Sequence, residues 1–207
     1  MIYTLYHVYD PMCSWCYAFK PTLDELRKNL KDNVKLVHVV GGLAKHSNED
    51  MPLNQQEMIS NIWHEIEAKV GTKFNHDFWK NCKPRRSTYL SCQATMLARY
   101  ENKEDEMIEA IQEAYYLKAM NPSDSSTLIQ LAKQIGMDEV KFEKDLHSEK
   151  IEKDLMDELN LRRSINVRSF PSLVLKYKKE TYPINIQFGN HKAMLAQIED
   201  MIENTYF

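Results

Sequence analysis

Cys13 and Cys16 lie three residues apart, directly after a segment that is typical of a β-strand. That segment, residues 2–9, is rich in aromatic and β-branched side chains. After the cysteines, leucines recur at helical spacing from Leu23 to Leu30, and Lys20-Pro21-Thr22 is acceptable in a first helical turn. The two cysteines are therefore expected where a strand ends and a helix begins.

This position favours redox chemistry at the pair. A helix N-terminus offers partial positive charge and unpaired N–H groups, which stabilise a thiolate at Cys13. Both sulfurs share one face of the first turn, close enough to form an exchangeable disulfide. A metal-binding pair and an inert structural disulfide are the alternatives. Because Cys82 and Cys92 supply no second pair of ligands at zinc spacing, we expect no metal site.

The rest of the chain predicts strands at both ends and helices between them. A buried strand over Val34–Val40 ends at Gly41-Gly42, and apolar residues then recur at helical spacing from Leu53 to about Arg163. Strand patterns return at Ser172–Tyr177 and Thr181–Gln187, and a final helix follows Gly189. A C-x-x-C pair in a β-α-β context is typical of a thioredoxin-like redox motif.

We therefore predict an α/β protein with a thioredoxin fold, interrupted by an all-helical subdomain. The expected division is a βαβ half at 1–50, a helical insertion at 51–163 and a ββα half at 164–207. Such an insertion leaves the sheet intact when it leaves and returns at one edge.

Charge and hydropathy limit the classes of molecule that the protein is expected to bind. The 207 residues include 27 basic and 30 acidic side chains, a net charge of -3, so no electrostatic footprint for nucleic acid is visible. No apolar run approaches the ~18 residues that span a bilayer, and no signal peptide precedes the first strand. We expect a cytoplasmic protein whose partners are protein or small-molecule thiols and disulfides, with no membrane partner. The oligomeric state is not indicated.

Three motifs carry a resemblance to a known family: DPMCSWC at residues 10–16, PRRSTY at 84–89 and SFPSLVL at 169–175. Together they resemble the DsbA-like thioredoxin superfamily, and most of all its cytosolic group of predicted protein-disulfide isomerases with a CSWC centre. The resemblance implies that Cys13 attacks, Cys16 resolves and Pro171 is a cis-proline facing them. Ser14-Trp15 replaces the Pro-His of secreted oxidising members, so we expect a milder redox potential.

Several residues around the pair are candidates for substrate binding. The backbone of Ser169 and Phe170 would be turned toward an extended peptide, and Trp15 offers an aromatic face to apolar side chains. Arg86 and Ser87 precede a helix and could bind a carboxylate, although Ser87 as a plain N-cap beside solvated arginines fits equally well. Tyr17 is expected to be a core residue of the first helix.

Asp10 is a candidate proton acceptor during resolution by Cys16, but a turn residue bonding to the backbone is the alternative. His7 and His38 lie in predicted central strands and are expected to be core histidines. Cys92 is expected to be a small core residue, with pairing to Cys82 as the alternative.

The sequence therefore favours a thiol-disulfide oxidoreductase or protein-disulfide isomerase that forms a mixed disulfide at Cys13 and resolves it with Cys16. It needs no cofactor, and glutathione is a candidate redox partner. One alternative is a glutathione-dependent transferase or isomerase of the kappa type; relatives of that type usually carry serine at the first cysteine position. The other is a non-catalytic, redox-sensing adaptor.

Overall fold

The computed structural model describes residues 2–204. Its four-stranded sheet has the order β2-β1-β3-β4, built from β1 (Tyr3–Tyr9), β2 (Val34–Val40), β3 (Ser172–Tyr177) and β4 (Glu180–Ile184). β1 and β2 are parallel, whereas β3 runs antiparallel to both β1 and β4. The first and last parts of the chain therefore meet at the centre of one sheet, as the prediction of a split thioredoxin fold requires.

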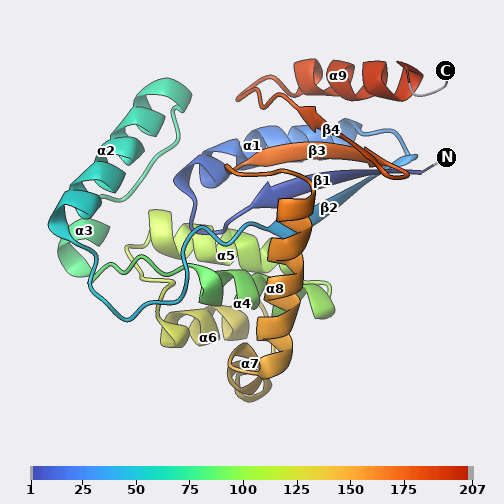
Figure 1. The fold of residues 1–207 in the computed structure, drawn as a ribbon. Coiled ribbons are helices and arrows are strands. Elements are labelled where there is room, and N and C mark those ends of the chain that lie inside the picture. Colours follow the sequence, from blue (N-terminus) through green and yellow to red (C-terminus); the bar gives the residue numbers. More distant parts are fainter. Residues whose placement is uncertain (1, 205–207) are drawn as a thin grey trace.

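Two helices cover one face of the sheet (Figure 1). They are α1 (Ser14–Asn29) and α9 (His191–Asn204). Met194, Ile198 and Ile202 of α9 recur every four residues, which places them on one helical face against the sheet. Leu173 and Leu175 of β3 point into the same layer, whereas the intervening Val174 points to the opposite face, as the alternation of side chains along a strand dictates.

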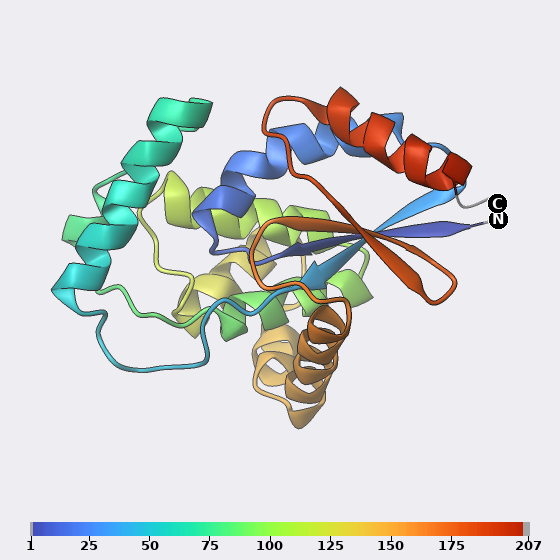
Figure 2. The same ribbon diagram turned by 45° about the horizontal axis from the view of Figure 1, so that its top comes forward.

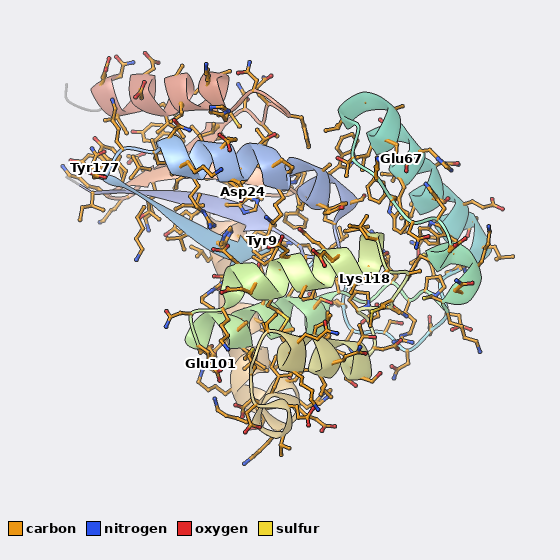
Figure 3. The ribbon with its side chains drawn as sticks, turned by 180° about the vertical axis from the view of Figure 1, so that it is seen from behind. Tyr9, Asp24, Glu67, Glu101, Lys118 and Tyr177 are labelled. Atoms are coloured by element: carbon orange, nitrogen blue, oxygen red, sulfur yellow. The ribbon has the colours of Figure 1, made fainter. Side chains whose placement is uncertain are left out.

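The other face and the redox end of the sheet are covered by seven helices of the described chain. They are α2 (Leu53–Val70), α3 (Phe78–Asn81), α4 (Tyr89–Tyr100), α5 (Glu104–Tyr116), α6 (Ser125–Gln134), α7 (Glu139–Leu146) and α8 (Glu149–Ser164). Figure 2 shows α2 standing beside the N-terminal end of α1, and α8 leading back into the strand region. Tyr9, between α1 and α5 in Figure 3, belongs to the same hydrophobic core as Cys13 and Cys16.

The described chain between β2 and β3 contains no further strand, apart from an isolated bridge of Asp50 to Arg85. An all-helical insertion packed against the redox end is thus confirmed. Among residues 2–204, none of the helices has both the length and the apolar character that crossing a bilayer requires.

Three element boundaries differ from the prediction. α1 begins at Ser14, so Pro21 lies inside the helix rather than in its first turn. The expected second strand of the C-terminal hairpin, Thr181–Gln187, is shorter and lies at Glu180–Ile184. The helix that follows Arg86 and Ser87 begins at Tyr89, with Thr88 rather than Ser87 as its N-cap.

Candidate active site

Cys13 occupies the N-cap position of α1, and Cys16 lies in the first turn of that helix. The carbonyl oxygen of Cys13 accepts a hydrogen bond from the N–H of Tyr17 at 3.0 Å, so the helix starts at this residue. Cys13 is 9% exposed and Cys16 is 3% exposed, and both are free thiols. The reactive pair therefore sits at a helix N-terminus with only Cys13 at the edge of solvent.

The two thiols have opposite shifts in acidity. A hydrogen bond from the Cys16 thiol, together with the backbone N–H groups of Cys16 and Trp15, lowers the pKa of Cys13 against the opposing effect of burial. Burial, followed by the interaction with Cys13, raises the pKa of Cys16 well above its usual value. Of the two thiols, Cys13 therefore ionises the more readily, and Cys16 holds its proton the more tightly.

Cys13 opens into a cavity of about 300 Å³. One wall is the start of α1 with Trp15, and the opposite wall is α2, which contributes Ile59, Ile62 and Trp63. Ser169 and Phe170 form a third side. The helical insertion and the segment before β3 therefore build one largely apolar groove around the sulfur.

The segment before β3 approaches the sulfur directly. Cys13 Sγ donates to the carbonyl oxygen of Phe170 at a distance of 3.7 Å. The peptide bond between Phe170 and Pro171 is cis, as the resemblance implied. Pro171 itself is half-buried and does not line the groove, so the groups that face Cys13 are those of Ser169 and Phe170.

Asp10, the candidate proton acceptor, is fully buried and saturated with donors. Its carboxylate accepts from the backbone N–H groups of Met12 and Leu43 at 2.9 and 2.7 Å and from the Thr88 hydroxyl at 2.7 Å. The Cys92 thiol also donates to it. Burial raises the pKa of Asp10 in spite of these bonds. The carboxylate therefore joins the active-site turn to the 41–44 loop and to α4. This agrees with the alternative role of Asp10, a turn residue that bonds to the backbone, and adds bonds to two further segments.

Arginine side chains supply the positive charge of the groove. Arg85, Arg86 and Arg168 line it, and Arg85 is engaged with Asp124. Within residues 2–204, Arg86 and Arg168 form no ion pair and remain available to an anion.

The prediction that Ser87 shares an anion site with Arg86 is wrong. It is 1% exposed, lies outside the groove, and its hydroxyl accepts from the N–H of Ser47 at 3.2 Å.

The remaining predicted residues divide between groove and core. Trp15 is half-buried in the groove, where its ring meets Phe188 edge to face with centroids 5.3 Å apart. Tyr17 stacks on Tyr116 at 4.6 Å and so behaves as the expected core residue. Cys82 donates to the carbonyl oxygen of Ala119 and is not paired with the buried Cys92.

His7 and His38, expected to be core histidines, do more than fill space. A second cavity of about 100 Å³, behind the redox pair, is lined by Cys16, His7 and His38. The Nδ1 atoms of the two histidines are 2.9 Å apart, and His38 Nε2 lies 3.2 Å from Asp105 at the surface, with Arg27 contacting both. His7 Nε2 is buried and has no hydrogen-bond partner among the described residues.

Burial, the neighbouring His38 and Arg27 all lower the pKa of His7, so its ring is neutral. Only the register of β1 with β2, which pairs His7 with His38, reveals this line of groups. The sequence signal was two histidines in adjacent strands, and no pattern gave their alignment.

A family model described as thioredoxin matches residues 6–196. That span contains the redox pair, the whole helical insertion and the segment before β3. The chain belongs to the DsbA-like thioredoxin family. Most members of the family are thiol-disulfide oxidoreductases.

Solved structures of the family share the complete fold. A candidate protein disulfide isomerase from Nitrosomonas europaea superposes with a TM-score of 0.85 over 99% of both chains, at 20% identity. The cytosolic disulfide reductase DsbM from Pseudomonas aeruginosa gives a TM-score of 0.76 over 97% of this chain and 98% of its own, at 19% identity. A second structure of DsbM, with GSH, gives 0.75 over 97% and 99%, at 18% identity.

Curated relatives carry a different description. The ClpXP adapter protein SpxH of Halalkalibacterium halodurans is 24% identical over 82% of this chain and 57% of its own length. SpxH of Bacillus subtilis is 22% identical over 82% of this chain and 56% of its own. The chain thus spans little more than half the length of these relatives.

Proposed function

We propose that the protein is a dithiol-disulfide oxidoreductase in which Cys13 attacks a substrate disulfide and Cys16 resolves the adduct. The observation that carries this proposal is the placement of the two sulfurs. Cys13 is at the N-terminus of α1, opens into the groove and lies beside the Phe170 carbonyl, whereas Cys16 is enclosed behind it. Only the outer sulfur can meet a substrate, and only the inner one can then meet the adduct.

The exchange proceeds in two balanced steps. The Cys13 thiolate attacks one sulfur of the substrate disulfide, forming a mixed disulfide and releasing the other sulfur as a thiolate. Cys16 then loses its proton and attacks Cys13 Sγ, which forms the Cys13–Cys16 disulfide and releases the second substrate thiolate. The substrate is reduced by two electrons and the pair is oxidised. Two molecules of an external thiol such as glutathione return the pair to the dithiol and leave joined as a disulfide.

His7 is the proton acceptor in this proposal. Once Cys13 is held in the mixed disulfide, its negative charge no longer opposes ionisation of Cys16. The neutral His7 ring lines the same cavity as Cys16, and its Nε2 has no hydrogen bond within residues 2–204. Asp10 fits this role less well, because its carboxylate already accepts four hydrogen bonds. The His38 and Asp105 contacts lead the proton toward the surface.

The substrate class follows from the groove. Its lining is largely apolar, and its charged groups without an ion pair in the described chain are Arg86 and Arg168. A small disulfide with carboxylates, such as a mixed disulfide of glutathione, would place a sulfur at Cys13 and a carboxylate at an arginine. The DsbM structure with GSH supports this choice.

Turnover of a mixed disulfide between glutathione and a reporter peptide tests the proposal. The parent should reduce it with glutathione as electron donor, Cys13→Ser should be inactive, and Cys16→Ser should accumulate a Cys13 adduct that mass spectrometry detects. Parent activity no greater than that of Cys13→Ser would overturn the proposal.

A second candidate, a protein adaptor, is favoured by the description of the SpxH relatives. In that case the groove would bind a partner protein and the thiols would not turn over. Stimulation of ClpXP-dependent degradation by both the parent and Cys13→Ser would support it.

The kappa-type glutathione transferase is the weaker alternative. Its chemistry uses a single serine in place of the first cysteine, whereas this chain keeps both thiols as a buried, hydrogen-bonded pair. A glutathione conjugation assay distinguishes it from disulfide exchange.

A further inference from the structure

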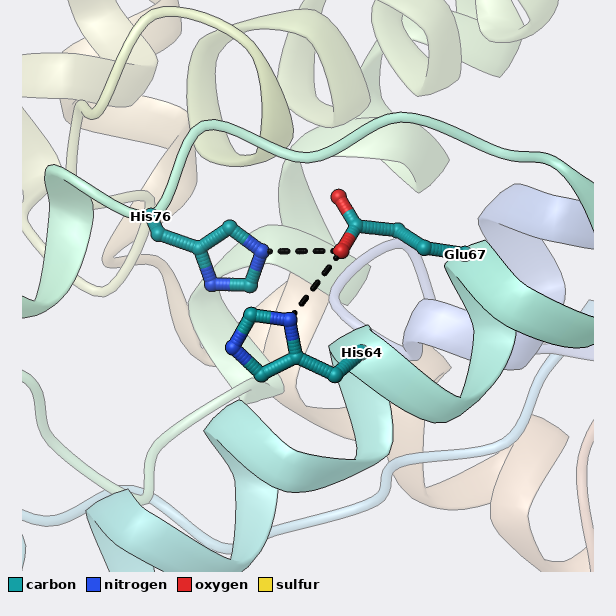
Figure 4. A group of neighbouring side chains, drawn as sticks. All are labelled: His64, Glu67 and His76. Carbon is teal, nitrogen blue, oxygen red and sulfur yellow. Dashed lines mark hydrogen bonds and ion pairs between the residues drawn. The ribbon is translucent and has the colours of Figure 1, made fainter.

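Three side chains with metal-binding atoms converge far from the two thiols in sequence, at the outer side of α2. His64 and Glu67 are one turn apart on the helix, and His76 returns to them from the loop that follows (Figure 4). Within residues 2–204, this is the only group in which at least three such ligand atoms come together, all lying within 4.8 Å of one another. The active-site proposal uses none of the three.

The distances match those of a tetrahedral ion. Glu67 Oε2 lies 3.2 Å from His64 Nδ1 and 3.1 Å from His76 Nε2. Bonds of about 2.0–2.2 Å from zinc to nitrogen and oxygen place neighbouring ligand atoms roughly 3.3–3.5 Å apart in a tetrahedron. The two nitrogen-to-oxygen separations are close to those values, and the two nitrogens lie within 4.8 Å of each other.

We propose that His64, Glu67 and His76 form a binding site for a divalent transition-metal ion of the zinc type. Two imidazoles and one carboxylate are a donor set that zinc accepts, with the fourth position left to water. The exposed fractions of the side chains, 62% for His64, 31% for Glu67 and 28% for His76, leave that position open to solvent. This proposal differs from the sequence-based expectation of no metal site, which considered only cysteine and paired-histidine spacings.

The surroundings hold the ligands in place. The other oxygen of Glu67, Oε1, accepts the backbone N–H of Phe74 at 3.2 Å, which leaves Oε2 for the metal. The two imidazole rings stack nearly parallel, with centroids 4.1 Å apart and an interplanar angle of 11°. His76 also packs against the fully buried Trp63, with centroids 5.8 Å apart. Both nitrogens are therefore directed at one oxygen from two different segments.

A metal at this position would join α2 to the loop at 72–77. That loop carries Phe74, whose ring stacks on Trp63 at 5.0 Å. Trp63, with Ile59 and Ile62, is part of the groove wall opposite α1. The ion would therefore stabilise the wall that α2 contributes to the groove, without contacting the redox pair.

The test must separate this site from the thiols, which also bind zinc. The full chain is oxidised so that Cys13 and Cys16 form a disulfide, stripped with a chelator and titrated with zinc by calorimetry. We expect one equivalent to bind and to raise Tm. Cobalt(II) bound at the same site should give visible d–d bands without a near-ultraviolet thiolate band. No binding, or a thiolate band, would overturn the proposal.

Variants locate the ion. His64→Ala and His76→Ala should weaken zinc binding by at least the ~10–100-fold that loss of an outer-shell partner costs, and zinc should no longer raise their Tm. Glu67→Gln keeps the size of the side chain while removing its charge, so it tests the site even if an alanine variant folds poorly. His147→Ala, at an exposed position after α7, is the matched control and should bind like the parent. Equal affinity in all four variants would place the zinc elsewhere and refute the site.

Discussion

The ring of Phe170 fills the space that a side chain at Gly41 would occupy. A Cβ built on Gly41 would lie 2.3 Å from ring atoms of Phe170, so no other residue fits at 41 while the ring stays in place. Arg162 donates to the Gly41 carbonyl at 2.6 Å and also lies over the Phe170 ring. The end of β2 thereby fixes the segment whose carbonyl faces Cys13.

Gly41→Ala should displace Phe170 and slow disulfide exchange. The added methyl group should also lower stability by about 1–3 kcal/mol, as overpacking of a close contact does. Thermal unfolding and turnover of the glutathione mixed disulfide measure the two effects. Gly41→Ala combined with Phe170→Leu makes room for the methyl group and should recover stability. If Gly41→Ala alone behaves like the parent, the contact does not position the segment.

The local patterns predict the sheet and its interruption well, because strand and helix periodicities are short-range properties. The start of α1 is different. Pro21 is typical of a first turn, yet the helix extends seven residues further toward the N-terminus, to Ser14, and tolerates a proline that cannot donate to the Tyr17 carbonyl. Cys16 and Ala18 pack in the core of the insertion, and this packing stabilises the extra residues of the helix. A local sequence pattern carries no information about such packing.

The residues of the site could be predicted only where they are close together in the sequence. Cys13 and Cys16 are recognised from their own spacing, whereas His7 requires the register of two strands. Arg86 and Ser87 are adjacent in sequence, but Arg86 lines the groove whereas Ser87 is buried against Ser47. Contacts between distant segments decide these outcomes.

Cys13 should be the first cysteine alkylated, and it should react below the pH at which an ordinary thiol does. Its pKa is lowered chiefly by the Cys16 thiol, whereas burial raises the pKa of Cys16, Cys82 and Cys92. Because a lowered pKa means more thiolate at a given pH, Cys16→Ala should shift the rate profile of Cys13 to higher pH. Iodoacetamide kinetics with mass mapping follow both. Faster labelling of Cys82 would contradict the assignment.

Arg86→Ala should raise KM for disulfides of glutathione by roughly tenfold, equivalent to about 1.4 kcal/mol, because a charge-assisted bond to a carboxylate is lost. An uncharged aromatic disulfide should be affected little, since its contacts are with the apolar lining of the groove. Arg163→Ala is the control, because Arg163 is exposed on α8 outside the groove and donates to Asn160. An equal rise in KM for both substrates would assign Arg86 a structural role.

His7→Gln should slow resolution of the Cys13 adduct rather than its formation. His7 Nε2 has no hydrogen-bond partner among residues 2–204, and the neutral ring shares a cavity with Cys16, so the substitution removes a base from that cavity. A glutamine amide preserves polarity but cannot accept the proton at neutral pH.

Stopped-flow formation of the adduct and quench-flow measurement of its decay separate the two steps. We expect decay to slow at neutral pH and to recover as the pH rises, because hydroxide can then ionise Cys16 without the imidazole. His38→Gln should show a smaller effect in the same direction, since it acts through its contact with His7. Parent-like decay at neutral pH in His7→Gln, with an unchanged pH profile, would return the role of proton acceptor to Asp10.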